Sequence, residues 1–149
     1  MQPEVIDSLA MHAAFDSGTL AHVMDALSGC EEAVTACSAG MLAEHDIDRM
    51  RANVMRDMDC SEVCATTRRL LMRATADDST LITAQLEACL IACQLSEEQC
   101  RMTAAEHEHC RLCIAATHRA IEACRQALAV LGARGFPPRA INGEPPRLT

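Results

Sequence analysis

Cysteine spacing is the feature that most restricts the fold of this chain of 149 residues. Within LEACLIACQLSEEQC, residues 86–100, Cys89, Cys93 and Cys100 follow one another at steps of four and seven. Those steps place all three side chains on one face of a helix with 3.6 residues per turn. The stretch contains no glycine, proline or aromatic residue that would favour a loop or a strand. We therefore predict a helix that presents a row of thiols to a protein core.

Three more segments repeat this alternation of three- and four-residue steps, which is typical of helices packed around a bundle axis. The four predicted core-facing rows, here called seams, are Leu20, Val23, Leu27, Cys30, Val34, Cys37 and Met41; Met50, Asn53, Asp57, Cys60, Cys64, Thr67 and Leu71; Ile82, Leu86, Cys89, Cys93, Ser96, Cys100, Thr103 and His107; and Cys110, Cys113, Thr117, Ala120, Cys124, Ala127 and Leu131. All ten cysteines lie on a seam.

The helix boundaries predict one all-α domain over residues 1–149, an antiparallel up-down-up-down four-helix bundle. Turns are expected near residues 45, 77 and 107, with Asp46 and one residue of Asp77-Asp78-Ser79 as helix N-caps. The bundle covers 17–133, preceded by a short extra N-terminal helix at 3–14. A Pro-rich C-terminal tail follows at 134–149, because its prolines cannot continue a helix.

Charge and composition exclude several classes of protein. The net charge of −8 argues against a nucleic-acid partner, which requires a basic face. No apolar run approaches the roughly 20 residues of a membrane span, so no membrane association is expected. The N-terminal segment has no basic region before its apolar stretch, which is unlike a signal peptide. We therefore expect a cytoplasmic protein, where thiols stay reduced.

In that compartment, ten cysteines indicate metal binding or catalysis more than disulfides. Side chains four apart on a helix have Cβ atoms about 5–6 Å apart, whereas a disulfide requires about 3.8 Å. Cys60 with Cys64 and Cys89 with Cys93 therefore suit a bridging metal better than a disulfide within their helix. Disulfides between helices stay possible at this point.

Folding the four helices about these turns predicts which side chains meet. The thiols separate into an inner cluster of six (Cys30, Cys60, Cys64, Cys89, Cys93, Cys124) and an outer cluster of four (Cys37, Cys100, Cys110, Cys113). Beyond the outer cluster lie further candidate metal ligands, Met41, Met50, His107 and His109, at an end here called the mouth. Beyond the inner cluster lie Leu20, Leu71, Ile82 and Leu131, here called the plug.

Plainer interpretations exist for several of these residues. Free cysteine and methionine also serve as core filler, and His107 and His109 could be solvated residues of a turn. His12, His22, His45 and His118 are expected on the surface. Asn53 and Asp57 indicate either a position near the mouth or a second helix rotated toward Val54 and Met58.

The ligand types favour one metal over others. Structural zinc prefers paired Cys or His ligands on turns, and only Cys110 and Cys113 have that spacing. The runs typical of iron–sulfur proteins do not occur. A di-iron bundle needs two Glu-x-x-His motifs, and the chain has one, from Glu106 to His109. Thiolate and thioether ligands select Cu(I).

The motifs MDCSEVC (58–64), ACLIAC (88–93), HEHCRLC (107–113) and EAC (122–124) resemble the Cys-rich four-helix-bundle copper storage proteins of bacteria. The resemblance covers about residues 17–132 and implies a core lined with thiolates that holds many Cu(I) ions in a homo-oligomer, usually a tetramer. Without an export signal, the chain resembles the cytosolic branch. Fuller members often have cysteine at the seam positions of Thr67, Ser96, Thr103, Thr117 and Ala120, so a lower capacity is expected.

The predicted function is non-enzymatic storage or sequestration of cytosolic Cu(I), with all ten cysteines, Met41, Met50, His107 and His109 as metal ligands. One alternative is a helical-bundle interaction protein in which the cysteines are mainly core filler. A metal-dependent redox protein is a further alternative. It is disfavoured because no base, nucleophile and orienting group occur together.

Overall fold

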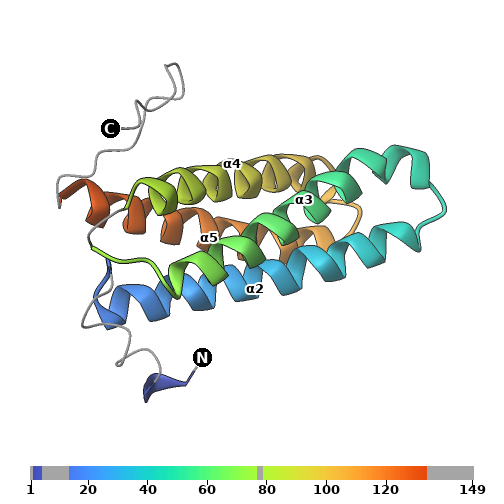
Figure 1. Ribbon diagram of the computed structural model, residues 1–149. Helices are drawn as coiled ribbons and strands as arrows, with labels where there is room; N and C mark the ends of the chain where they lie inside the picture. Colours follow the sequence, from blue (N-terminus) through green and yellow to red (C-terminus); the bar gives the residue numbers. More distant parts are fainter. Residues whose placement is uncertain (1, 5–13, 77–78, 134–149) are drawn as a thin grey trace, which may run out of the picture.

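The computed structural model describes residues 2–4, 14–76 and 79–133. Its regular elements are four long helices: α2 (Ser17–Leu42), α3 (Ile47–Leu71), α4 (Thr80–Thr103) and α5 (Glu108–Ala133). They pack side by side as an antiparallel bundle in which α2 contacts α3 and α5, and α4 contacts the same two neighbours (Figure 1). The predicted up-down-up-down bundle is therefore confirmed.

The two ends of the bundle differ in their connections. The turn between α2 and α3 (residues 43–46) and the turn between α4 and α5 (residues 104–107) lie at one end, which is the mouth (Figure 1). The link between α3 and α4 lies at the other end, where α2 begins and α5 finishes. The third turn was predicted near residue 107 and occupies residues 104–107, because Glu108 and His109 already belong to α5.

Helix capping corrects part of the prediction. Asp46 and Ser79 occupy N-cap positions, but neither side chain makes a capping hydrogen bond. The side-chain cap forms instead at Asp16, where the sequence indicated only a break. Its carboxylate accepts hydrogen bonds from Thr19 N at 2.8 Å and from Thr19 Oγ1 at 2.7 Å. These bonds satisfy one of the free amides of the first turn of α2 and fix where the helix begins.

The core follows the predicted seams. Every seam residue within the four helices is buried, and His107, which lies in the turn before α5, is half-buried. The four plug residues are at most 4% exposed, and Phe15 covers the same end. Ala14 N donates a 3.2 Å hydrogen bond to Ala74 O, so the segment before α2 is tied to the segment after α3. One end of the bundle is thus closed by apolar side chains.

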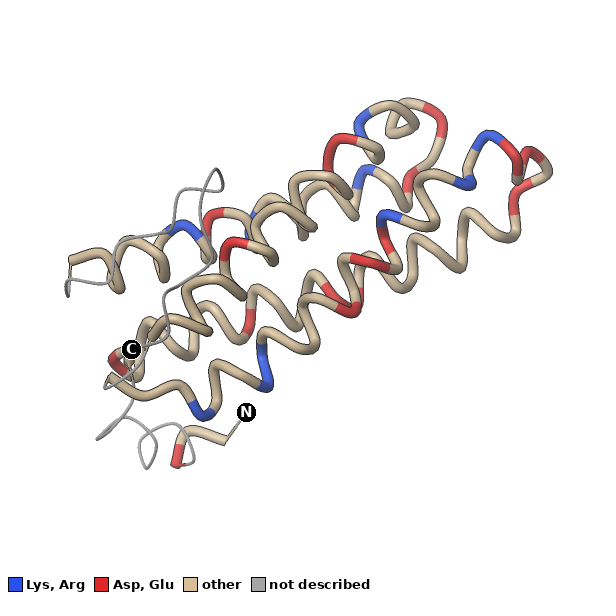
Figure 2. Tube along the Cα trace, turned by 45° about the horizontal axis from the view of Figure 1, so that its top comes forward, with Lys and Arg blue, Asp and Glu red and all other residues tan. Residues whose placement is uncertain are grey.

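Charged residues occur along all four helices and gather around the two turns of the mouth (Figure 2). There Arg49, near the start of α3, donates two 3.0 Å hydrogen bonds to Glu106 of the turn between α4 and α5. No helix in the described part of the chain is long and apolar enough to cross a membrane. The helix predicted over 3–14 and the tail at 134–149 fall almost wholly outside the described residues. Both stay predictions.

Candidate functional site

The ten cysteines form a single column of thiols along the bundle axis. Each is at most 1% exposed, and all ten are free. The prediction that every cysteine sulfur faces the core is therefore confirmed. Because four helices each contribute thiols at matched heights, sulfurs far apart in the sequence come within 4 Å of one another.

The inner cluster contains two triangles of sulfur atoms that share one edge. In the first, Cys30 Sγ lies 3.7 Å from Cys60 Sγ and 4.0 Å from Cys93 Sγ. The shared Cys60–Cys93 edge is 3.7 Å. In the second, Cys64 Sγ lies 4.0 Å from Cys60 and 3.9 Å from Cys93.

The size of these triangles suits a metal ion. The centre of each triangle lies about 2.2 Å from its three sulfurs, close to the ~2.3 Å of a zinc–thiolate bond. A disulfide requires ~2.05 Å between sulfurs, so none of these pairs, at 3.7–4.0 Å, is bonded. The inner cluster is thus arranged for three-sulfur coordination of a soft ion.

Cys89 and Cys124 extend the inner cluster toward the plug. Cys89 Sγ lies 3.9 Å from Cys64 Sγ, and the thiol of Cys124 interacts with that of Cys89. The column therefore continues from the second triangle to α5. All six predicted members of the inner cluster come together.

The outer cluster surrounds a buried carboxylate. Asp57 Oδ1 accepts hydrogen bonds from Ser96 Oγ at 2.6 Å, Cys100 Sγ at 3.8 Å and Cys113 Sγ at 3.9 Å. With Cys37, these two thiols and the carboxylate offer four ligand atoms within 4.8 Å of one another. Asp57 is fully buried, and no partner in the described part of the chain reaches its Oδ2. A buried carboxylate oxygen without a hydrogen-bond partner, beside three thiols, is a candidate for a further metal ligand.

The burial of Asn53 and Asp57 decides between the two interpretations of the second seam. Asn53 and Asp57 are buried on the side of α3 toward the mouth, whereas Met58 is half exposed. Asn53 Nδ2 donates a 2.9 Å hydrogen bond to Thr103 Oγ1, which itself contacts Cys110 Sγ at 3.2 Å. The helix is therefore not rotated away from the axis, and its polar residues line the outer cluster.

His109 stands between the outer cluster and the mouth. Its Nδ1 lies 3.5 Å from both Cys37 Sγ and Cys110 Sγ, and these two sulfurs are 4.0 Å apart. Its Nε2 points the other way, toward Glu44. One imidazole thus spans from the buried thiols to the half-exposed rim.

The other predicted ligands at the mouth are placed differently. His107 stacks on His109 and contacts Glu44, not a thiol. Met41 and Met50 are at most 1% exposed and belong to the packed core at this end. Their role as ligands stays a prediction. His22, His45 and His118 are exposed as expected, and His12 is outside the described residues.

Mutual hydrogen bonds make the thiols ionise unequally. Thiol donation from Cys30, Cys64 and Cys93 lowers the pKa of Cys60, because it stabilises the Cys60 thiolate. Hydrogen bonds with Cys30, Cys60, Cys64 and Cys89 raise the pKa of Cys93. In the outer cluster, Cys100 and Cys37 lower the pKa of Cys113 in the same way. A hydrogen bond with Cys30 also lowers the pKa of Cys64, to about 6. Ionisation is therefore spread unevenly over the thiols of each cluster, and a cation among the sulfurs would favour their ionised forms.

Burial, together with the negative charge of the Cys113 thiolate, raises the pKa of Asp57 to about 7, while the hydrogen bond from Ser96 opposes both. Sequence reasoning left Asp57 out of the ligand set, although its place on a seam, three residues before Cys60, was a usable signal. Glu44 was also missed, because it lies beyond the helix and shows no periodicity.

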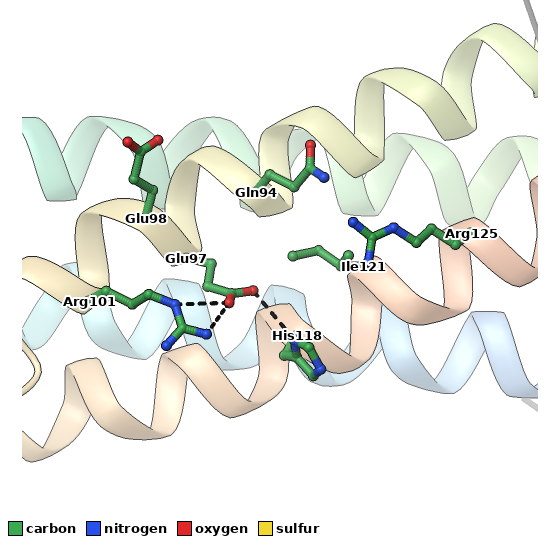
Figure 3. Close-up of a pocket in the computed structure, with 7 residues that line it drawn as sticks. All are labelled: Gln94, Glu97, Glu98, Arg101, His118, Ile121 and Arg125. Atoms are coloured by element: carbon green, nitrogen blue, oxygen red, sulfur yellow. Dashed lines mark hydrogen bonds and ion pairs between the residues drawn. The ribbon is translucent and has the colours of Figure 1, made fainter.

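Surface cavities are chemically different from this column. Figure 3 shows one between α4 and α5, where Glu97 interacts with Arg101 (Nε–Oε1 3.1 Å) and lies 3.8 Å from His118 Nδ1. Charged and polar side chains and Ile121 line it, and none of its lining residues is a cysteine. The thiols therefore lie on the buried axis and not in this cavity.

Comparison with known proteins gives the same picture. A copper storage protein of Streptomyces lividans, solved with ten copper equivalents, is 34% identical and superposes with a TM-score of 0.75 over 78% of this chain and 88% of its own. The structure of a cytosolic copper storage protein from that organism with five coppers is 33% identical, with a TM-score of 0.73 over 75% and 93% of the two chains. A variant of the Streptomyces protein with two histidines changed to alanine is 32% identical, with a TM-score of 0.75 over 80% and 100%.

No curated protein matches the chain. The family model described as copper storage protein matches residues 16–129, which is the whole bundle except the last residues of α5. The buried thiol column, the four-helix fold and this match agree: the chain belongs to the copper storage protein family.

Proposed function

We propose that the protein stores copper in the cytosol as Cu(I), in multinuclear thiolate clusters along the bundle axis. The observation that carries this proposal is the pair of sulfur triangles that share the Cys60–Cys93 edge. Thiolates that serve two triangles bridge two ions, so ions in the cluster share ligands. Thiolate ligands select Cu(I), and burial of the cysteines keeps water away from the bound ions.

The outer cluster would hold further ions with a mixed ligand set. Cys37, Cys100 and Cys113 supply sulfur, and Asp57 supplies a carboxylate oxygen that can replace a cysteine. This substitution fits the seam positions at which Ser96 and Thr103 stand instead of cysteine. Ser96 and Thr103 then orient Asp57 and Cys110 through hydrogen bonds.

Copper would enter at the mouth, because the plug offers no ligand and excludes water. His109 offers the first nitrogen beside Cys37 and Cys110, with His107, Met41 and Met50 as further ligands at the same end. An ion passed by ligand exchange needs successive ligands within reach, and His109 with Cys37 and Cys110 supplies the first of these.

The proposed cytosolic location rests on the description of a relative as a cytosolic copper storage protein. We also propose that the protein assembles as a homotetramer. Half-exposed Met55, Met58 and Ile91, with the apolar furrow between α3 and α4, give this face a surface for self-association. The mass of the protein in solution measures the state of assembly.

Titration of the reduced protein with Cu(I) against a competing chelator tests the storage proposal. If each ion has its own thiolate pair, ten thiols hold about five ions, and if every thiolate bridges two ions they hold about ten. The double variant Cys60→Ser, Cys93→Ser removes the shared edge and is expected to lose about two ions or more. Thr117→Ser, whose hydroxyl bonds only backbone carbonyls, should keep the full capacity. Uptake of one ion or none would instead favour cysteines that only fill the core.

The pH dependence of stability tests the state of Asp57 in the metal-free protein. Its pKa is about 7 when folded against an ordinary 3.8, so between these values the folded state holds a proton that the unfolded chain has lost. Stability from this group is therefore fully present below about pH 4, falls as the pH rises to about 7 and stays low above it. Asp57→Asn should raise the free energy of unfolding near pH 8 by up to about 4 kcal/mol and change it little near pH 4.

Urea unfolding at both pH values measures this effect. Asp59→Asn, an exposed carboxylate on the same helix, is the matched control and should show no such pH-dependent gain. Equal gains of Asp57→Asn at the two pH values would mean that folding does not raise the pKa of Asp57.

Loading kinetics test the entry route. His109→Ala should slow Cu(I) uptake while leaving the final number of bound ions almost unchanged, because it removes the first ligand but no thiol. Stopped-flow absorbance of the copper–thiolate charge transfer gives the rate. His118→Ala, an exposed histidine on the same helix, should load as the wild type does. A wild-type rate for His109→Ala would show that copper does not enter past this ring.

A further inference from the structure

A second set of ligand atoms lies at the rim of the mouth and contains no sulfur. Glu44, from the turn after α2, faces His107, from the turn before α5, and His109, from the first turn of α5. Glu44 Oε1 is 3.2 Å from His107 Nδ1 and 3.3 Å from His109 Nε2. All three ligand atoms lie within 4.8 Å of one another.

The arrangement has the geometry of a metal site. Two ligands bound at ~2.0–2.2 Å with tetrahedral angles lie about 3.4 Å apart, close to the two observed distances. The imidazole rings stack with centroids 5.2 Å apart and an interplanar angle of 18°, so each turns a nitrogen toward the same carboxylate oxygen. The side chains of His107, His109 and Glu44 are 17%, 26% and 34% exposed, which leaves an entry path and room for water ligands.

The neighbouring charged residues do not compete with His107 and His109 for the carboxylate of Glu44. Arg49, which could compete for it, is engaged by both oxygens of Glu106. The ion pairs of Glu44 in the described part of the chain are with His107 and His109 alone. A cation placed among the three groups would therefore meet one carboxylate oxygen and two imidazole nitrogens.

The donor set selects a different class of ion from the thiol column. Imidazole and carboxylate suit borderline divalent ions such as Zn²⁺, Ni²⁺ and Cu²⁺, whereas Cu(I) selects thiolate and thioether. His109 uses opposite nitrogens in the two places, Nδ1 toward Cys37 and Cys110 and Nε2 toward Glu44. Because a neutral imidazole offers one unprotonated nitrogen, ligation of ions at both places at once would require His109 to release its ring proton.

We propose that Glu44, His107 and His109 form a divalent-cation site at the mouth, separate from the thiolate clusters. Three protein ligands leave at least one coordination position for water, as in zinc sites that are not closed. The shared ring of His109 places a divalent ion one imidazole away from the first thiols of the column. This proposal does not depend on Cu(I) storage.

Co²⁺ added to the reduced, copper-free protein under anaerobic conditions is the probe. The sulfur-free site should give weak visible d–d absorption without a near-ultraviolet sulfur-to-cobalt charge-transfer band, whereas Co²⁺ among the thiolates gives that band. Glu44→Gln should weaken the sulfur-free component at least about tenfold, because the loss of even an outer-shell partner of a ligand costs 10–100-fold.

Glu106→Gln is the matched control. It removes a carboxylate from the same rim, 3.9 Å from the other nitrogen of His107, and should change the affinity less than about twofold. Two results would overturn the proposal: cobalt that appears only with the charge-transfer band, or a sulfur-free component that Glu44→Gln binds as tightly as the wild type. The Cu(I) capacity of Glu44→Gln should equal that of the wild type, so a failure here is distinct from a failure of copper storage.

Discussion

Contact between thiols on different helices, at 3.7–4.0 Å in a core that excludes water, is the constraint on which the rest of the structure depends. The cysteine side chain is small, so four helices can approach the axis closely enough to bring six thiols into one cluster. Large aromatic side chains would hold the helices apart, and the described core contains a single one, Phe15, at the plug. The same closeness that packs the apoprotein leaves triangles of metal-bonding size. Packing and copper binding are thus two consequences of one geometry.

The bundle is polarised along its axis. Leucine and isoleucine close one end, thiols fill the middle, and a carboxylate, hydroxyls and imidazoles appear toward the mouth. Hardness of the ligands therefore increases from Cys124 to Glu44, and each zone favours a different ion or protonation state. Asp57 marks the boundary, since its pKa of about 7 leaves it close to half-protonated under physiological conditions. A cation among the neighbouring sulfurs would favour its ionised form.

Periodicity predicted most of this structure because a bundle core repeats with the helix. The seams, the two clusters and the plug all follow from steps of three and four residues. The properties that were missed have no period. Capping at Asp16 depends on one side-chain rotamer, while the role of Glu44 depends on how two turns meet. Asp57 lay on a seam, but its burial is tolerated only because Ser96 and two thiols donate to it, which requires the three-dimensional contacts.

X-ray absorption at the copper edge of the Cu(I)-loaded protein tests the central claim most directly. Ions at the centres of sulfur triangles should show about three sulfur neighbours at about 2.2–2.3 Å. A short copper–copper distance should also appear, because the triangles share the Cys60–Cys93 edge. A first shell dominated by nitrogen or oxygen, or copper ions with no copper neighbour, would contradict storage in the thiol column.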